Sequence, residues 1–327
     1  MIKSLVNALN SHRFVLLLAL LLFLLMVPLI MKASWVSLVN EMLIMALAGC
    51  ALNLMLGYTG MVSFGPAGLY AVGAYTTAIL LTRYRFPFAI AVISAPILAG
   101  IIGGLVGWFC VRRSAVYFAL LTLAFAQIIW TIIFEWYGFT GGDNGIVSIP
   151  IPEFFFSISH CYYLTLIVVG VSLLLLWTIV QSPFGKTLQA IRENPGRTEF
   201  IAIHLKQYQL SAFVLSSAFL GIAGSLFCVF SGSVFPDFAH WVKSTDMLVI
   251  CLLGGFYNFG GPIVGSVVYI LLSKMISKQT MFWMFFLGVI IVFLVLFMRN
   301  GIVGFLSEKL APVLHKASGP GVDEGTR

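Results

Sequence analysis

Hydrophobic residues along this chain gather into long blocks that are separated by short polar or glycine-rich segments. A block of about 20 apolar residues is long enough to cross a hydrocarbon core of about 30 Å as a helix. The pattern predicts an all-α, polytopic integral membrane protein of about ten transmembrane helices. The expected spans cover residues 14–31, 35–56, 61–81, 87–110, 116–137, 161–181, 208–231, 241–256, 261–275 and 281–298.

The number of spans depends on residues 241–275, which form either one long helix or two short ones broken at "GGFYNFGGP" (254–262). Ten spans place most Lys and Arg residues in the cytoplasm together with both termini, and nine spans divide the charges more evenly. The positive-inside rule therefore favours ten. We expect one transmembrane domain over residues 1–314, followed by a disordered cytoplasmic tail at 315–327.

Composition agrees with this fold, since 61% of the 327 residues are hydrophobic and 9% are charged. The net charge of +7 indicates cytoplasmic loops and anionic lipid rather than nucleic acid. The five cysteines form no CxxC pair and the five histidines share no spacing, so we expect no metal, no cofactor and no catalytic residues. The first apolar block runs to Lys32 without a cleavage site, which predicts a retained span.

The longest polar run inside the apolar region is "SPFGKTLQAIRENPGRTEF" (182–200), and its letters GKT are also the end of a phosphate-binding loop. Such a loop needs a glycine five residues before Gly185, where this chain has Val180. Pro183 removes one further amide, and no strand precedes the run. The segment therefore does not bind a nucleotide.

The same run has the features of two short amphipathic helices joined at Asn194-Pro195, where Asn194 can cap the second helix. Apolar residues at helical spacing would present knobs to a soluble cytoplasmic partner. The alternative is an interfacial loop that anchors to lipid headgroups. The expected stripes are Leu188 with Ile191 before the cap, and Phe200 with Ile203, or Ile201 with Leu205, after it.

Two glycine-rich breaks interrupt the apolar blocks: "GYTGMVSFGPAG" at 57–68 and "GGFYNFGGPIVG" at 254–265. Unpaired backbone at membrane depth survives only inside protein or beside a wet cavity, and in transporters such breaks often lie near the substrate. The alternative is a tight turn between packed helices. The likeness of the two breaks hints at an internal repeat.

Two polar residues lie within expected spans. Glu41 is either a proton carrier or a residue near the outer interface that pairs locally, and its distance of six residues from Trp35 favours the second reading. Gln127 is better placed for a transport path, although it can also bond a neighbouring helix. Glycine pairs in "AGIIGGLVG" (99–107) permit close helix contact, either within the chain or with a second subunit.

Several stretches together resemble the permease subunits of ABC importers for branched-chain amino acids, a group that also serves urea, amides and related solutes. These stretches occur in the order of the family and extend over nearly the whole chain. They are "GYTGMVSFGPAGLYAVGAYTTAIL" (57–80), "VYFALLTLAFAQ" (116–127), "TGGDNGI" (140–146), "SPFGKTLQAIRENP" (182–195), "YQLSAFVLSSAFLGIAGSL" (208–226) and "LLGGFYNFGGPIVGSVV" (252–268).

The resemblance implies about ten helices, a second permease subunit, two cytoplasmic ABC ATPases and an extracytoplasmic solute-binding protein, in the bacterial inner membrane. It places the ATPase-coupling loop at residues 185–205. Three departures occur there, with Arg197 and Thr198 in place of alanines and Ala202 in place of a glycine. The coupling residues implied are Gly185, Leu188, Ile191, Arg192, Glu193, Pro195, Glu199, Phe200, Ile201 and Leu205.

We therefore expect a permease subunit that translocates branched-chain amino acids or a related small solute. The alternatives are a urea, amide or other amino acid permease, a proton-coupled secondary transporter using Glu41, and a structural membrane protein. Pro66 replaces a histidine that many members of the family carry, and this departure bears on the identity of the solute. The expected path residues are Asn53, Tyr58, Ser63, Phe64, Gln127, Gly254 and Gly255, and the expected docking residues for the binding protein are Thr140, Gly141, Asp143, Asn144 and Asp237.

Overall fold

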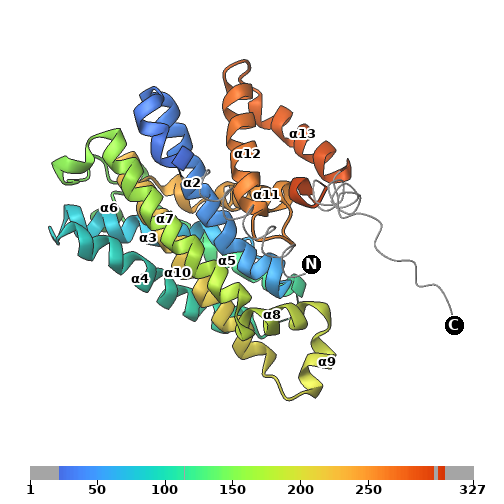
Figure 1. Cartoon of the computed structure of the whole chain (residues 1–327). Coiled ribbons are helices and arrows are strands. Elements are labelled where there is room, and N and C mark those ends of the chain that lie inside the picture. The colour runs from blue at the N-terminus through green and yellow to red at the C-terminus, as the bar shows by residue number, and fades with distance from the viewer. Residues whose placement is uncertain (1–21, 114, 298–300, 306–327) are drawn as a thin grey trace, which may run out of the picture.

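The computed structural model describes residues 22–113, 115–297 and 301–305, and within these ranges it is built from helices without a β-strand (Figure 1). The expected tail at 315–327 and residues 14–21 of the first expected span lie outside the described residues, and residues 22–30 of that span are helical. The longer helices are α2 (Ala33–Asn53), α3 (Pro66–Thr82), α4 (Phe88–Cys110), α5 (Ala115–Glu135), α7 (Ile158–Gln181), α10 (Leu205–Ser231), α11 (Trp241–Gly254), α12 (Gly261–Ser277) and α13 (Trp283–Phe297).

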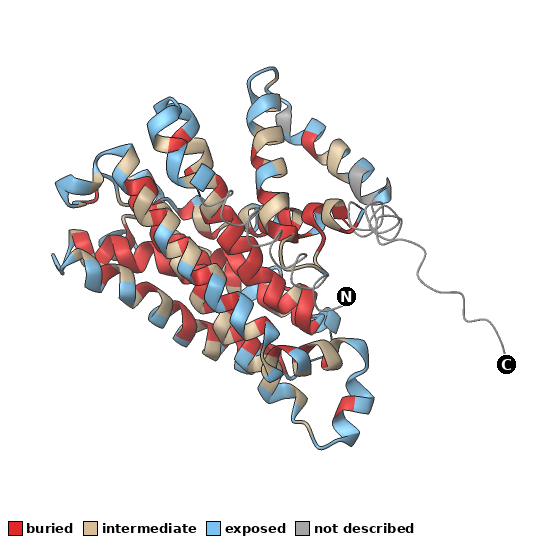
Figure 2. Cartoon of the chain, in the orientation of Figure 1, coloured by how far each residue is buried: buried red, intermediate tan, exposed pale blue. Residues whose placement is uncertain are grey.

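Helix α10 lies at the centre of the bundle, where it packs against α2, α3 and α4 (Figure 1). Buried residues concentrate on these helices, whereas the outer faces of α4 and α7 are exposed and apolar (Figure 2). Five helical segments have the length and composition of a membrane span: Ala33–Tyr58, Phe88–Cys110, Ala115–Glu135, Ile158–Gln181 and Leu205–Ser231. An apolar exterior of this kind suits a hydrocarbon environment.

Small residues allow the central helices to approach closely. Gly73 on α3 meets the backbone of Gly221 on α10, with no room for a side chain on either. On α4, Gly103 faces Ser217 and Gly107 faces Phe213, both on α10. The glycine stripe of α4 therefore serves packing within the chain, which decides between the two possibilities that the sequence leaves open.

Residues 241–275 form two helices, α11 and α12, separated by a non-helical turn at 255–260. Two short helices were the favoured interpretation of this region, and the structure confirms it. The expected span at 241–256 corresponds to α11, which begins at Trp241 and ends at Gly254. With 14 residues, α11 is about 21 Å long, which is less than the core of a bilayer.

Candidate functional site

The polar run 182–200 folds into two short helices, α8 (Pro183–Glu193) and α9 (Pro195–Phe200), as the sequence predicts. Each begins with a proline at its first position and a side-chain cap before it. The Ser182 hydroxyl accepts a hydrogen bond from the amide of Gly185 at 3.4 Å, and Asn194 Oδ1 accepts one from the amide of Arg197 at 2.9 Å. These caps fix the corner between the two helices.

One face of α8 is anchored inside the chain. Leu188 and Ile191 are fully buried, and Gly185 lies against the backbone of Val180 with no room for a side chain. These three expected coupling residues therefore hold α8 on the bundle and are not presented to a partner. The outward apolar surface is formed instead by Phe200 and Ile201, which are 92% and 67% exposed.

The apolar stripe expected beyond the cap does not form, because α9 ends at Phe200. Ala202 adopts a left-handed conformation with φ of 61°, which stops the helix, and Leu205 opens α10. Ile203 and Leu205 thus do not share a helix face with Phe200 and Ile201. A left-handed position favours glycine over alanine.

Thr198 joins α9 to α8. Its side chain is buried, and its hydroxyl donates to the carbonyl of Ala190 at 3.1 Å and to that of Asn194 at 2.9 Å. An alanine at this position could not make either bond. The Thr198 hydroxyl therefore ties α9 to the end of α8.

The two glycine-rich breaks meet in space. The last turn of α2 widens into a π-helix, η1 (Leu54–Tyr58), which the Thr59 hydroxyl closes by bonding to Met55 O at 2.6 Å. Gly57 lies against the carbonyl of Phe256, and Asn53 Nδ2 donates to Asn258 O at 3.5 Å. Segments about 200 residues apart in sequence are thereby in contact at one end of the bundle.

Arg192 on α8 lies between these breaks. Its guanidinium donates to the carbonyl of Gly57 and lies 5.1 Å from the ring centroid of Tyr257. Its stem packs on Gly60, where an added Cβ would be 3.0 Å from Arg192 Cγ. One cation thus contacts both breaks.

A cavity of about 270 Å³ opens beside this contact. It is walled on one side by the Arg113 loop and on the other by Arg192 and Pro195, with Met61, Phe118 and Ile191 as apolar lining. The cavity joins the coupling segment to the first break. The cavity is partly polar and lies beside α8, at the lower end of the bundle in Figure 1.

The remaining expected path residues are less closely grouped. Ser63 is buried, and the Phe64 amide donates to Thr122 Oγ1 on α5 at 3.2 Å, so the first break continues toward α5. Gly255 has φ of 102° and forms the start of the second break with Gly254, near Asn53 and Tyr58. Gln127 is half-buried on α5, and no contact joins it to this group.

The opposite end of the bundle carries the segment Tyr137–Asn144. Here Gly141 adopts φ of 85° and Gly145 φ of 64°, which only glycine does readily. The Tyr137 hydroxyl donates to Asp143, and this hydrogen bond raises the pKa of the tyrosine. Asp143 and Asn144 are exposed, whereas Thr140 is buried and bonds its hydroxyl to Ile133 O at 2.6 Å.

Two loops at this end are joined by backbone hydrogen bonds. The amide of Ile146 donates to Val234 O at 2.9 Å, and the amide of Val234 returns a bond to Ile146 O at 2.8 Å. The second loop continues into the 3-10 helix η4 (Pro236–Ala239), where Asp237 is exposed. The expected docking residues Asp143, Asn144 and Asp237 thus lie on two connected loops.

Glu41 makes a local ion pair. Its Oε2 lies 3.7 Å from Nζ of Lys274, near the C-terminal end of α12. This geometry matches the locally paired residue rather than a carboxylate held free within the bundle. It weakens the proton-carrier alternative.

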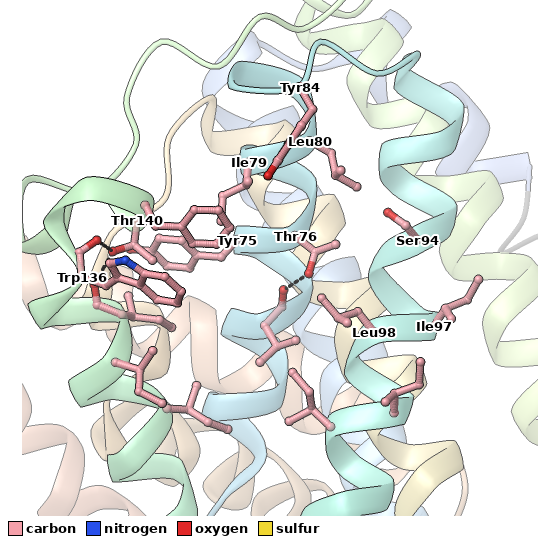
Figure 3. Close-up of a pocket in the computed structure, with 17 residues that line it drawn as sticks. Tyr75, Thr76, Ile79, Leu80, Tyr84, Ser94, Ile97, Leu98, Trp136 and Thr140 are labelled. Atoms are coloured by element: carbon pink, nitrogen blue, oxygen red, sulfur yellow. Dashed lines mark hydrogen bonds between the residues drawn. The ribbon is translucent and has the colours of Figure 1, made fainter.

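An apolar groove of about 510 Å³ runs between α3, α4 and α5 (Figure 3). Its walls include Ile79, Leu98 and Trp136. The hydroxyls of Thr76, Ser94 and Thr140 are bonded within the chain, as Thr76 is to Val72 O at 2.6 Å. Tyr75 contributes its ring to the wall from α3. A groove of this composition suits alkyl chains and not a polar solute.

The fold is that of a polytopic membrane protein, with helical breaks in the bundle and the short helices α8 and α9 beneath them, an arrangement typical of transporters. A family model described as "Branched-chain amino acid transport system / permease component" matches residues 34–295. The chain belongs to this family. It is a membrane permease component of a transport system and not an enzyme.

Relatives with curated names are permease proteins of the same kind. The chain is 27% identical over 310 residues to the high-affinity branched-chain amino acid transport system permease protein LivM of Escherichia coli, covering 86% of this chain and 73% of the relative. It is 23% identical over 267 residues to a probable LivM of Methanocaldococcus jannaschii (69% and 76%). It is 25% identical over 245 residues to a probable LivH of that organism (67% and 73%). No solved structure is significantly similar to the chain.

Proposed function

We propose that this chain forms half of an ATP-driven import path for branched-chain amino acids in the bacterial cytoplasmic membrane. The observation that carries the proposal is the position of Arg192, which ties the cytoplasmic helix α8 to both breaks of the bundle. Force applied to α8 and α9 by an ATPase would reach the backbone of the path directly. The family match supports the solute class.

Each end of the molecule would bind a different kind of partner. Two ABC ATPases would engage Glu199, Phe200 and Ile201, which form the exposed part of the coupling segment. A solute-binding protein would dock on the loops that carry Asp143 and Asp237. The second permease would be a homologous chain, since both a LivM and a LivH of one organism resemble this one.

The proposal is tested by leucine uptake into vesicles that contain the permease pair, both ATPases and the binding protein, with ATP and the proton gradient controlled separately. We expect uptake to require ATP and to persist when the gradient is collapsed. Uptake that follows the gradient in vesicles lacking the ATPases would instead support a secondary transporter. ATP-dependent uptake of urea or amides, and not of leucine, would change the solute class only.

The coupling surface is tested by the double variant Glu199→Lys with Phe200→Asp. Both positions are exposed, so the permease should fold normally, while the ATPases should no longer co-purify. The matched control is Phe154→Asp, an exposed phenylalanine at the opposite end of the bundle, which should retain them. If the double variant keeps both ATPases, the coupling surface lies elsewhere.

A further inference from the structure

The cavity of about 270 Å³ beside α8 is bordered by two arginines, and its lining among the described residues includes no carboxylate. Arg113 comes from the loop between α4 and α5, and Arg192 comes from α8. Two like charges at one cavity repel each other unless an anion lies between them. The charge of the cavity therefore points to an anionic ligand.

Neither arginine is neutralised by a buried acidic group. Arg192 donates to the carbonyl of Gly57, which is a neutral acceptor, and its ion pair with Glu193 is 3.9 Å long, with a carboxylate that is 73% exposed. A pair of that kind contributes little, because water screens it. Arg113 has no ion pair within the described part of the chain. The charge of both arginines is thus available to a ligand.

The rest of the cavity wall is mixed. Its apolar part is formed by Met61, Val111, Phe118 and Ile191. Its polar part includes Thr59, whose hydroxyl gives its proton to Met55 O at 2.6 Å, and Gln209 on α10. The Thr59 oxygen and the Gln209 amide oxygen can still accept hydrogen bonds, as an ammonium group would require. The wall therefore offers partners for a carboxylate, an ammonium group and an alkyl chain.

The size of the cavity restricts the ligand to a small molecule. A water molecule occupies about 30 Å³ of liquid, so a cavity of about 270 Å³ holds a molecule of about nine non-hydrogen atoms. Leucine has this size and carries all three kinds of group. Inorganic phosphate would satisfy the arginines and leave the apolar wall without a partner.

We propose that this cavity is a cytoplasmic binding site for the imported amino acid, and that product bound there slows further import. The carboxylate binds between Arg113 and Arg192, and the alkyl chain lies against Phe118 and Ile191. A ligand in this position ties α8 to the loop between α4 and α5, and so opposes any displacement of α8 by an ATPase. This inference rests on the proposed function, because it takes leucine-like solutes as the cargo.

The site is tested in vesicles that contain the assembled transporter, enclose ATP and carry the binding protein outside. We expect the initial rate of labelled leucine uptake to fall as the unlabelled leucine enclosed in the vesicles rises into the millimolar range. The same concentration of enclosed glycine should have little effect, because glycine has no alkyl chain. Uptake that ignores enclosed leucine would overturn the proposal, and equal inhibition by enclosed inorganic phosphate would show a general anion site instead.

The variant Arg113→Gln removes one of the two cations. The enclosed leucine concentration that halves uptake should rise about fivefold, a moderate change because Arg113 is exposed to water. Uptake without enclosed leucine should be unchanged, and Arg113→Lys should keep most of the inhibition because it keeps the charge.

The matched control is Arg112→Gln, which removes the same charge from the neighbouring position. The Arg112 guanidinium lies 3.9 Å from the ring centroid of Trp108, and Arg112 is not part of the cavity lining. Inhibition should therefore be as in the parent protein. Equal relief of inhibition by both glutamine variants would show an effect of net charge alone and would refute the site.

Two further outcomes separate the site from its alternatives. If Arg113→Gln releases the ATPases and leaves the inhibition of the remaining complexes unchanged, Arg113 is a subunit contact and the site is overturned. A parent complex without ATP-driven leucine uptake would contradict the proposed function instead. The site is then measured by equilibrium binding of leucine to the solubilised complex without binding protein, which Arg113→Gln should weaken about fivefold and Arg112→Gln should not.

Discussion

The roles of single residues in this chain depend on close tertiary contacts that the sequence does not reveal. Gly57 appears in the sequence as one of several glycines in a break, yet it is the point where the two breaks touch. Arg192 appears as one of several cations in a polar run, yet its guanidinium reaches both breaks. The role of each residue comes from what lies opposite it in space.

Replacing Gly57 by alanine should destabilise the permease by about 1–3 kcal/mol, because the new Cβ would clash with the carbonyl of Phe256 and with Asn53 Oδ1. The thermal midpoint of the purified complex measures this loss. Gly170→Ala in α7 is the control, since nothing lies within 4 Å of its Cβ position. Equal midpoints for the two variants would mean that the breaks do not press on each other.

Ala202→Gly should stabilise the turn after α9 by about 0.5–1 kcal/mol, since alanine at φ of 61° is strained there. The amide at position 202 donates to Glu199 O at 3.0 Å, so its hydrogen exchange should slow about threefold. The control Ala190→Gly lies within helix α8 and should speed local exchange. Faster exchange at 202 would show that the left-handed turn is not populated.

At the scale of elements, α8 and α9 are held together as one structural unit. The caps at Ser182 and Asn194 start each helix, and Thr198 bonds the second helix to the first. The sequence predicts the cap at Asn194, because asparagine before proline is a local signal, and the Ser182 cap before Pro183 is a local signal of the same kind that the sequence analysis missed. It misses the Thr198 bonds, which require both helices to be placed first.

Asn194→Ala should loosen α9 by about 1 kcal/mol, because the amide of Arg197 loses its acceptor. Hydrogen exchange at Arg197 should accelerate about fivefold, and the apparent affinity for the ATPases should fall with it. Asn194→Asp keeps an acceptor and should behave like the parent protein. Unaltered exchange in the alanine variant would show that Thr198 alone holds the corner.

At the scale of the whole molecule, the loops sort into two groups as a membrane topology requires. The breaks at 57–65 and 255–260 lie with α8 and α9, and the loops at 137–152 and 232–240 lie together at the other end. This grouping agrees with the charge distribution along the sequence. Along the chain these segments alternate between the two ends, which requires an odd number of crossings between each segment and the next, with α3, α4 and α5 between the first two.

Single cysteines at Ser148 and at Lys186 test this topology in a variant whose five buried native cysteines are alanine. Both positions are exposed, at opposite ends of the bundle. An impermeant reagent added to intact cells should label position 148 and reach 186 only after the membrane is opened. Labelling at 186 in intact cells would invert the orientation.

The sequence by itself determined the class of fold, the span positions and the helix caps, because apolar block length and capping residues act locally. It also ruled out a nucleotide loop through Val180 and Pro183. Only the tertiary structure decided that the two breaks meet and that Leu188 and Ile191 face inward. Those features depend on which surfaces lie opposite each other after packing, and hydrophobic pattern carries no such information.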